Sequence, residues 1–537
     1  MKNVTAILSM LHEGAGPNSA TRLFRAEPVL RWTLKRLARA QRLDSTAILC
    51  WEDQMDHVAR IAAEAEAFVL AKGPRVHLPE VESISAARRW SDGWRGGLLS
   101  TCDFDLGFYG PWFGELAAKV NAEAVVLVDP AAALVDPHLL DSLVIQAENH
   151  PEAPITFVPA APGLGGALVK RDLLDKVAVT KTHIGRLFHY LPDQISREPL
   201  ASDWCAPLPT PVARTTQRFK LDSERQLARV SAATVSLNGQ LISSRAEEIV
   251  HRLHAWDAID ALPRELVLEI NTRRSTRPIF WPAANQPIER ADFSAQAAPA
   301  LFEQLARYDD VRLTIAGVGD PLLHAGVFDL IELARVEGIA CIHVETDLHD
   351  ITPENVRRLA TMPVDVVSMH LPAVLPQTYA ATMGVNGYTR VLENIGAFLA
   401  ARQGRGVPIL VPTFTKCRQN LAEMETWYDQ WLRAVGCAVI RGPSDFGGMI
   451  PGLAVADMAP SRRSACSRLN SRLTLLCDGR YVSCEQDVLG RQQLGELGTD
   501  SIADIWQKRM NVLRADHRAG KWADHPTCAT CREWHRP

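Results

Sequence analysis

The stretch Leu473-Thr-Leu-Leu-Cys-Asp-Gly-Arg-Tyr-Val-Ser-Cys484 places an Asp-Gly pair between two short runs of strand-forming residues. This arrangement is typical of a β-hairpin with a tight turn at Asp478-Gly479. A hairpin returns the chain along its own path. We therefore expect it to bring Cys484 back toward the cysteine pair near the end of the chain, Cys528 and Cys531.

The cysteines around this hairpin form a pattern. Cys466, Cys484, Cys528 and Cys531 are spaced C-x17-C-x43-C-x2-C, and Cys477 lies between the first two. The final C-x2-C lets two thiolates reach one metal centre. An iron–sulfur cluster and a structural zinc ion both accept four thiolates, and at a zinc site His525 or His535 could replace one of them. The pattern predicts a metal centre and by itself leaves both metals open.

The residues after the hairpin extend the pattern. They read Leu494-Gly-Glu-Leu497, then Ser501-Ile-Ala-Asp-Ile-Trp506 and Leu513-Arg514, before the closing C-x2-C. This order resembles a SPASM or twitch domain, the auxiliary-cluster unit that follows many radical-SAM cores. The resemblance implies that the four cysteines ligate one [4Fe-4S] cluster, with Cys477 as a spare or a packing residue. Complete SPASM domains have more cysteines and hold two clusters.

Six short apolar runs precede this region, with amphipathic helical stretches between them. Parallel strands need such crossovers, so the alternation favours a partial or complete β/α barrel whose rim loops hold ligands. The expected strands are Leu266–Ile270, Val311–Ala316, Ile339–Val344, Val364–Met369, Val407–Val411 and Ala438–Arg441.

The order of motifs in this barrel resembles a radical-SAM core. Gly317-Val-Gly-Asp-Pro321 resembles the Gly-Gly-Glu-Pro loop that meets the amino group of S-adenosylmethionine. The resemblance implies that Gly317, Gly319, Asp320 and Pro321 form a degenerate binding loop for that cofactor. The alternatives are a tight strand-to-helix turn and, for Asp320, an acid stabilised by a helix N-terminus.

The family's C-x3-C-x2-C motif is missing after the first barrel strand. Its positions read Arg274, Pro278 and Trp281, none of which ligates iron, while the barrel's own cysteines, Cys341, Cys417 and Cys437, are far apart. We therefore expect no 5′-deoxyadenosyl radical. The arginines at 273, 274 and 277 form either an anion-binding cluster or a solvated basic loop.

The first 231 residues also alternate between short apolar runs and helical stretches, which favours a mainly parallel sheet. Ala6–Gly16, Ser19–Leu23 and Phe219–Leu227 resemble motifs of cytidylyl and sugar-nucleotide transferases. The resemblance implies that Asp129, in Val125-Val-Leu-Val-Asp129, holds Mg²⁺, although Asp-Pro is also an ordinary turn. The lysine expected after Arg22-Leu is absent, so only Arg22 or Arg25 could replace it.

The expected fold class is α/β throughout, and the order resembles fused spiro-SPASM proteins. We expect a Rossmann-like nucleotidyltransferase fold at residues 1–231 and a linker helix region at 232–262. A partial (β/α) barrel of radical-SAM type follows at 263–457, and a small SPASM/twitch iron–sulfur domain at 458–537.

Composition narrows the functional classes. The 537 residues include 58 Lys and Arg against 62 Asp and Glu, a net charge of −4, so no basic field favours nucleic acid. No apolar run approaches the roughly 20 residues needed to span a bilayer, and Met1–Met10 fits a first strand better than a signal peptide. We expect a cytoplasmic protein whose cysteines stay reduced.

These observations predict an iron–sulfur protein of the radical-SAM/SPASM class that has lost its SAM-cleaving cysteines. The alternatives are a sugar or CMP nucleotidyltransferase and a non-catalytic module in surface-polysaccharide synthesis. The substrate class stays open among a small molecule, a sugar nucleotide and a protein.

Overall fold

The computed structural model describes residues 1–12, 19–190, 203–255, 260–282, 286–450, 452–456 and 458–536. The chain divides into two compact units, Met1–Ala258 and Ile259–Pro537. Within these ranges, every helix is too short or too polar to cross a lipid bilayer.

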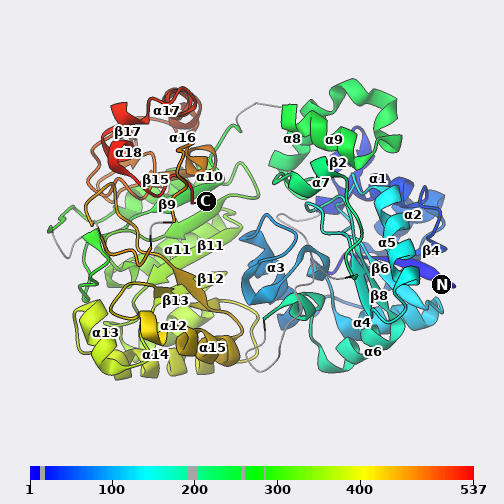
Figure 1. Ribbon diagram of the computed structural model, residues 1–537, viewed down its shortest axis with the longest axis horizontal. Helices are drawn as coiled ribbons and strands as arrows, with labels where there is room; N and C mark the ends of the chain where they lie inside the picture. Colours follow the sequence, from blue (N-terminus) through cyan, green and yellow to red (C-terminus); the bar gives the residue numbers. More distant parts are fainter. Residues whose placement is uncertain are drawn as a thin grey trace. The chain divides into compact units, whose positions relative to one another are not determined.

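The first unit is built on a six-stranded sheet of order β5-β4-β1-β6-β8-β7 (Figure 1). Its parallel strands are β1 (Val4–Ser9), β4 (Ser45–Cys50), β5 (Phe68–Ala71) and β6 (Ala124–Leu127), and β8 (Ala167–Lys170) runs antiparallel between β6 and β7 (Ile155–Phe157). Successive side chains of a strand point to opposite faces, so apolar strands buried on both faces need helices on each.

The helices of this unit supply those two layers. One core joins the sheet to α1 (Val29–Leu37), α2 (Met55–Ala62), α5 (Pro137–Asn149), α8 (Glu224–Ala233) and α9 (Ala246–Ala255). The other joins it to α4 (Gly110–Lys119) and α6 (Arg171–Thr180). Helix α9 lies in the range predicted as a linker, and its Ile249 and Leu253 are fully buried in the first unit. The predicted α/β class is therefore confirmed for this half.

The second unit contains a nine-stranded sheet of order β14-β13-β12-β11-β10-β9-β15-β16-β17. Its six barrel strands, all parallel, are β9 (Glu265–Leu268), β10 (Arg312–Ile315), β11 (Cys341–Thr346), β12 (Val366–His370), β13 (Ile409–Thr415) and β14 (Val439–Arg441). Each overlaps a strand predicted from the sequence. The partial barrel is therefore confirmed.

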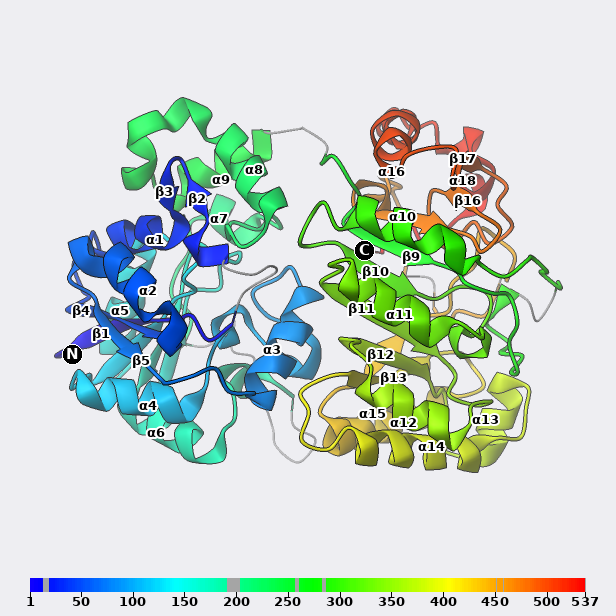
Figure 2. The same ribbon diagram turned by 180° about the vertical axis from the view of Figure 1, so that it is seen from behind.

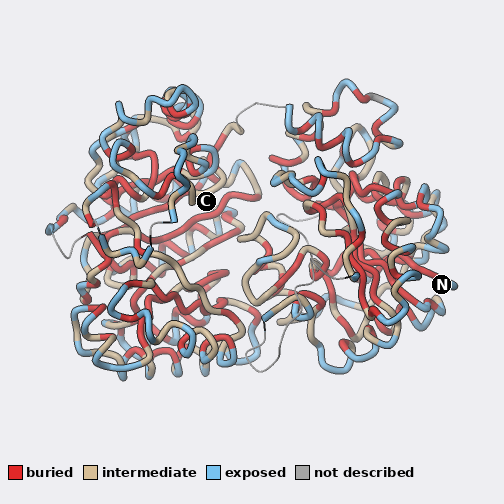
Figure 3. The backbone as a smooth tube through the Cα atoms, viewed as in Figure 1, coloured by how far each residue is buried: buried red, intermediate tan, exposed pale blue. Residues whose placement is uncertain are grey.

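Six helices connect or flank these strands, and Figure 2 shows α10, α11, α12 and α14 along one side of the sheet. They are α10 (Ala298–Leu305), α11 (Val327–Val336), α12 (Pro353–Thr361), α13 (Pro376–Met383), α14 (Tyr388–Ala401) and α15 (Met424–Val435). Figure 3 shows the buried segments following the strands. The inner side of the strands is left free to line a cavity.

The C-terminal strands continue the barrel sheet. β15 (Arg472–Leu475) pairs in parallel with β9, and β16 (Arg480–Val482) and β17 (Gln493–Glu496) follow antiparallel. The β15–β16 hairpin turns at Gly479, whose φ of +90° favours glycine, as the Asp-Gly pair predicts. One continuous core joins this tail to the barrel. The finer division at residues 457 and 458 stays a prediction.

The tail ends in short helices. They are α16 (Ile502–Asp504), α17 (Met510–Arg518) and α18 (Pro526–Thr530), with a wider turn at Ile505–Arg509 between the first two. The hydroxyl of Ser501 caps α16 by accepting from the Asp504 N–H at 3.0 Å. Trp506, in the wider turn, is fully buried, which fixes this segment against the shared core.

Candidate metal centre and barrel cavity

The four patterned cysteines come from separate parts of the tail. Cys466 precedes the turn Ser467–Asn470, Cys484 follows β16, and Cys528 and Cys531 lie within and directly after α18. Burial is the main reason why the pKa of Cys484, Cys528 and Cys531 is raised; Cys528 adds to the rise at Cys484, and Cys466 adds to it at Cys528 and Cys531. Such interactions fade with distance, so they indicate that these thiols lie near one another, and their shared role as ligands stays a prediction.

The surroundings of these thiols are partly apolar and contain fixed hydrogen bonds. Burial is the main reason why the pKa of Cys528 rises to about 11 and that of Cys531 to about 12. The Glu533 N–H donates to Cys531 Sγ at 3.3 Å, and Arg463 donates to the Cys528 carbonyl at 2.9 Å. Thiols of this kind lose their protons when a metal binds, and N–H donors to sulfur then stabilise the thiolate.

The spacing of the sulfurs is wider than a compact ion site. Among the described residues, three ligand atoms, from His150, Glu152 and Asp203 of the first unit, all lie within 4.8 Å of one another. No three of the four tail sulfurs approach that closely.

The other predicted metal ligands lie in different environments. Cys477 Sγ donates to Glu269 Oε1 at 3.2 Å and is buried. His525 lies 2.7 Å from Gln492 Nε2 through Nδ1 and 3.2 Å from Asp516 Oδ2 through Nε2, so both its ring nitrogens have partners. His535 packs its ring against Trp534.

The predicted cofactor loop leaves β10 as a tight turn. A Cβ at Gly317, whose φ is +148°, would meet the Glu269 side chain at 2.5 Å, and one at Gly319 would meet Asn271 Oδ1 at 2.2 Å. Asp320 is buried and accepts from the Leu322 N–H, the Thr346 hydroxyl and the Asp347 N–H. Pro321 begins a short 3₁₀ turn. The glycines are therefore required by close packing within the barrel.

Arg274 lies directly on this loop. Its guanidinium donates to the Val318 carbonyl at 3.1 Å, to the Gly319 carbonyl at 3.2 Å and to Asp347 Oδ1 at 2.6 Å. Trp281 Nε1 donates to the same Val318 carbonyl at 2.9 Å, and Pro278, the second position of the missing motif, is buried. The first and third positions of the missing motif, Arg274 and Trp281, are thus bonded to the loop.

A buried chain of charged groups leads from Arg274 to the cavity. Asp347 Oδ1 lies 2.9 Å from His370 Nδ1, and His370 Nε2 lies 2.5 Å from Glu345 Oε1, which also binds Arg441 at 2.8 Å. Burial alone would lower the pKa of His370, but Glu345 and Asp347 raise it. Burial would likewise raise the pKa of Glu345, and Arg441 and His370 hold it well below its usual range. The chain therefore carries alternating charges.

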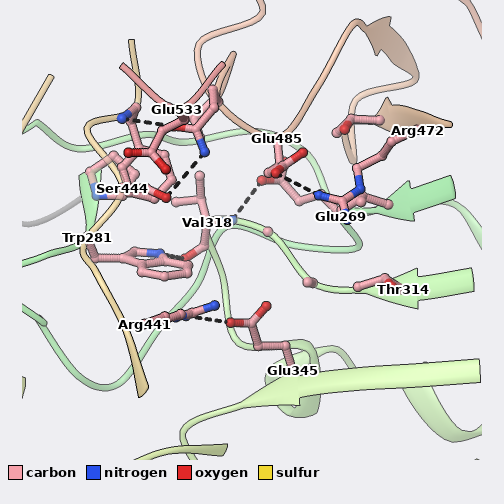
Figure 4. A pocket seen from close by; sticks show the side chains of 18 of the residues that line it. Glu269, Trp281, Thr314, Val318, Glu345, Arg441, Ser444, Arg472, Glu485 and Glu533 are labelled. Carbon is pink, nitrogen blue, oxygen red and sulfur yellow. Dashed lines mark hydrogen bonds and ion pairs between the residues drawn. The ribbon is translucent and has the colours of Figure 1, made fainter. Parts of the chain in front are cut away.

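Glu345 and Arg441 open into a cavity of about 610 Å³ (Figure 4). Its lining comes from β9, β10, β11, β13, β14 and β15, so the sheet curves around it. Burial lowers the pKa of His343, so its imidazole in this lining is neutral near pH 7. The volume is typical of a small-molecule site.

The motifs in the sequence did not single out these inner residues. Polar side chains alternate along the strands, as in His343-Val-Glu345 and Ser368-Met-His370, and place one polar row on the face opposite the helices. A parallel strand buried on both faces normally reads as continuously apolar. The alternation was the available signal for a polar barrel interior.

In the first unit, Asp129 lies after β6 at the end of the sheet. Its carboxylate binds the fully buried ammonium group of Lys220, which lies 3.2 Å from Asp103 Oδ1 as well. Burial would raise the pKa of Asp129, and Lys220 holds it far below its usual range. A cation of the chain therefore lies beside Asp129, and the role of Asp129 as a Mg²⁺ ligand stays a prediction. Residues 13–18, within the expected nucleotide loop, lie outside the described residues.

Comparison with known families identifies the tail. Residues 466–532 match the SPASM family, an iron-sulfur cluster-binding domain. The end of this chain is a SPASM domain. The SPASM match includes all four patterned cysteines and the hairpin between the first two.

Other proteins are similar to larger parts of the chain. An uncharacterized protein of Treponema pallidum (strain Nichols) is 25% identical over 344 residues, which cover 61% of this chain and 92% of that protein. BtrN in complex with AdoMet and 2-DOIA is 15% identical with a TM-score of 0.36, over 50% of this chain and 93% of BtrN. Streptococcus suis SuiB bound to precursor peptide SuiA has a TM-score of 0.41 at 12% identity, over 72% of this chain and 84% of the SuiB chain. A cytidylyltransferase from Leptospira borgpetersenii serovar Hardjo-bovis (strain JB197) has a TM-score of 0.33 at 13% identity, over 48% of this chain and 98% of the cytidylyltransferase chain.

Proposed function

We propose that Cys466, Cys484, Cys528 and Cys531 hold one [4Fe-4S] cluster, and that the protein acts through this cluster without cleaving S-adenosylmethionine. The observation that carries the proposal is the gathering of four thiols within a SPASM domain. A bound cluster supplies a one-electron redox centre. No disulfide joins the eleven cysteines in the described structure, which fits a reducing compartment, so the cytoplasm is the proposed location.

The spacing of the thiols supports a cluster over zinc. A tetrahedral Zn²⁺ with bonds of about 2.3 Å needs sulfurs about 3.8 Å apart. No three of the sulfurs in the described tail lie within 4.8 Å of one another. In a cluster each thiolate binds a different iron atom, so wider spacing suits it.

Arg274 supports the loss of SAM cleavage. Its side chain is 5% exposed, and it occupies the carbonyl groups of Val318 and Gly319 that an incoming amino group would need. A bound S-adenosylmethionine would have to break these bonds and leave Asp347 without its guanidinium partner. Removing one partner of a buried ion pair is strongly unfavourable, because the other charge stays buried without compensation. We therefore propose that the loop Gly317–Pro321 serves the fold of this barrel.

The cluster segments also form part of the cavity wall. Arg468, Glu485 and Glu533 line the cavity, and each lies within two residues of a cysteine in the set. A molecule in the cavity would therefore lie close to the cluster. This proximity supports a role in holding or exchanging electrons with a bound molecule.

Metal and sulfide analysis tests the proposal. The full chain is purified without oxygen, and its iron, acid-labile sulfide and zinc are measured. We expect about four iron and four sulfide per chain. Zinc in place of iron, with no sulfide, would overturn the cluster.

A second measurement tests the absence of SAM cleavage. The cluster-loaded protein is reduced with dithionite in the presence of S-adenosylmethionine, and 5′-deoxyadenosine is measured by chromatography. We expect none above a sample without protein. Its formation would show that another group of the chain replaces the missing cysteines.

A further inference from the structure

The cavity is highly charged, yet its charges are paired. Arg441 binds Glu345 at 2.8 Å, Arg472 binds Glu265 at 3.0 Å, and Arg536 binds Glu533 at 2.7 Å. A lining of this kind offers no excess charge to a polyphosphate or a polycation. It suits a ligand that carries both signs, because each end can be matched by one member of a pair.

Two polar atoms on the tail side of the cavity, Glu485 Oε2 and Thr474 Oγ1, make no hydrogen bond in the described structure. Both Arg468 and Arg472 bind Glu485 through Oε1, while Oε2 is buried without a hydrogen bond among the described residues. The Thr474 hydroxyl, 3% exposed, also lines the cavity without a hydrogen bond in the described structure. A buried carboxylate oxygen and a hydroxyl left unpaired are costly. A ligand with N–H donors would satisfy both.

Arg441 provides the complementary group. It is 39% exposed, and its Nη2 binds Glu345 and His370 while Nε donates to Thr415. Its Nη1 makes no hydrogen bond within the described part of the chain. A guanidinium with a free edge is suited to a carboxylate. Figure 4 shows Arg441 and Glu485 on opposite sides of the cavity, so the two complementary groups of a ligand must be separated.

The space between these two groups is partly apolar. Val318 lies between them in Figure 4, with the Trp281 ring at one side, and Phe446 packs on Trp281 at a centroid distance of 5.6 Å. Such a wall favours a hydrocarbon or peptide linker over a second charged group.

We propose that the cavity binds an extended dipolar molecule, with a primary ammonium group at Glu485 and Thr474 and a carboxylate at Arg441. An ω-amino acid and a short peptide share this chemistry. The inference rests on the proposed function in one respect, because the cluster fixes the segment that carries Glu485. A nucleoside triphosphate does not match this cavity.

Calorimetric titration of the full, cluster-loaded chain tests the inference. The dipolar probes are 6-aminohexanoate and trialanine. Hexanoate and hexylamine are control ligands that each lack one charged group, and CTP is the polyphosphate control. We expect saturable binding of at least one dipolar probe, and about tenfold weaker binding of hexanoate and hexylamine. The two dipolar probes distinguish an amino acid from a peptide.

Variants assign the two ends. Arg441→Gln and Glu485→Gln should each weaken the dipolar probe about tenfold, which is about 1.4 kcal/mol, whereas Arg273→Gln should not. Arg273 is a matched control because it is 56% exposed and pairs with Asp292 outside the cavity. Only variants with wild-type iron and sulfide are compared.

Two results would overturn the inference: no saturable binding of either dipolar probe up to about 10 mM, or equal binding of hexanoate or CTP. Iron and sulfide are measured on the same samples. A cluster-loaded protein that binds no dipolar probe refutes the ligand class alone, whereas a protein without sulfide refutes the proposed function.

Discussion

The guanidinium carbon of Arg274 lies 4.4 Å from the centre of the Trp281 ring, and both side chains donate to the carbonyl of Val318. The two side chains therefore fix each other's position and the position of the loop after β10. The same guanidinium neutralises Asp347, which is completely buried. One cation thus connects the loop, the aromatic wall of the cavity and the charged chain that reaches Glu345.

Removing this cation should destabilise the second unit. Arg274→Met leaves the Asp347 carboxylate buried without its guanidinium, so we expect the free energy of unfolding to fall by about 3 kcal/mol. Urea unfolding followed by circular dichroism measures the loss. Arg277→Met, at an exposed position of the same loop, is the control. Adding Asp347→Asn to Arg274→Met should recover part of the loss, and an unchanged urea midpoint in Arg274→Met would contradict this role.

The cysteines should divide into ligands and packing residues. Cys528→Ser should lose most of the iron that the wild type binds, because a serine oxygen is a poor ligand for iron in such clusters. Cys477→Ser should keep the wild-type iron and sulfide, because the Cys477 thiol binds Glu269. Iron and sulfide assays on protein made without oxygen compare them. Equal loss in both variants would exclude this division.

Stability should depend on pH through His370. Its folded pKa is raised above its ordinary value of about 6.5 because Glu345 and Asp347 outweigh the effect of burial. The imidazolium therefore contributes stability that is fully present below pH 6.5 and is lost as pH rises through the raised pKa.

The measurement is the difference in unfolding free energy between the wild type and His370→Gln across pH. We expect this difference to be largest on the acid side and to shrink as pH rises. His349→Gln, on an imidazole that is half-buried and hydrogen-bonded to Ser275, serves as the control. A difference that grows with pH would mean that His370 is neutral in the folded protein.

Lys220 should determine whether the first unit responds to Mg²⁺. In the wild type its ammonium group binds Asp129 and Asp103, so we expect millimolar Mg²⁺ to leave the thermal unfolding midpoint unchanged. Lys220→Ala leaves two carboxylates without their cation, which lowers the midpoint, and Mg²⁺ should then restore part of it. Lys176→Ala, on an exposed face of α6, is the control. A wild-type response to Mg²⁺ would return Asp129 to the role of metal ligand.

The sequence by itself determined the elements and the cysteine set. Apolar runs located all six barrel strands, and Asp478-Gly479 located the hairpin, because both signals depend on residues close together in the chain. The SPASM motifs located the tail for the same reason.

Only the tertiary structure decided the contents of the barrel. Arg274 and Asp347 are 73 residues apart, and Arg472 and Glu265 are 207 residues apart, yet each pair shares a hydrogen bond. The pairing of β15 with β9 and the closure of the cavity depend on the same long-range contacts. Local periodicity gives the face on which a side chain lies, but which distant side chain it meets there is set by how the strands pack together.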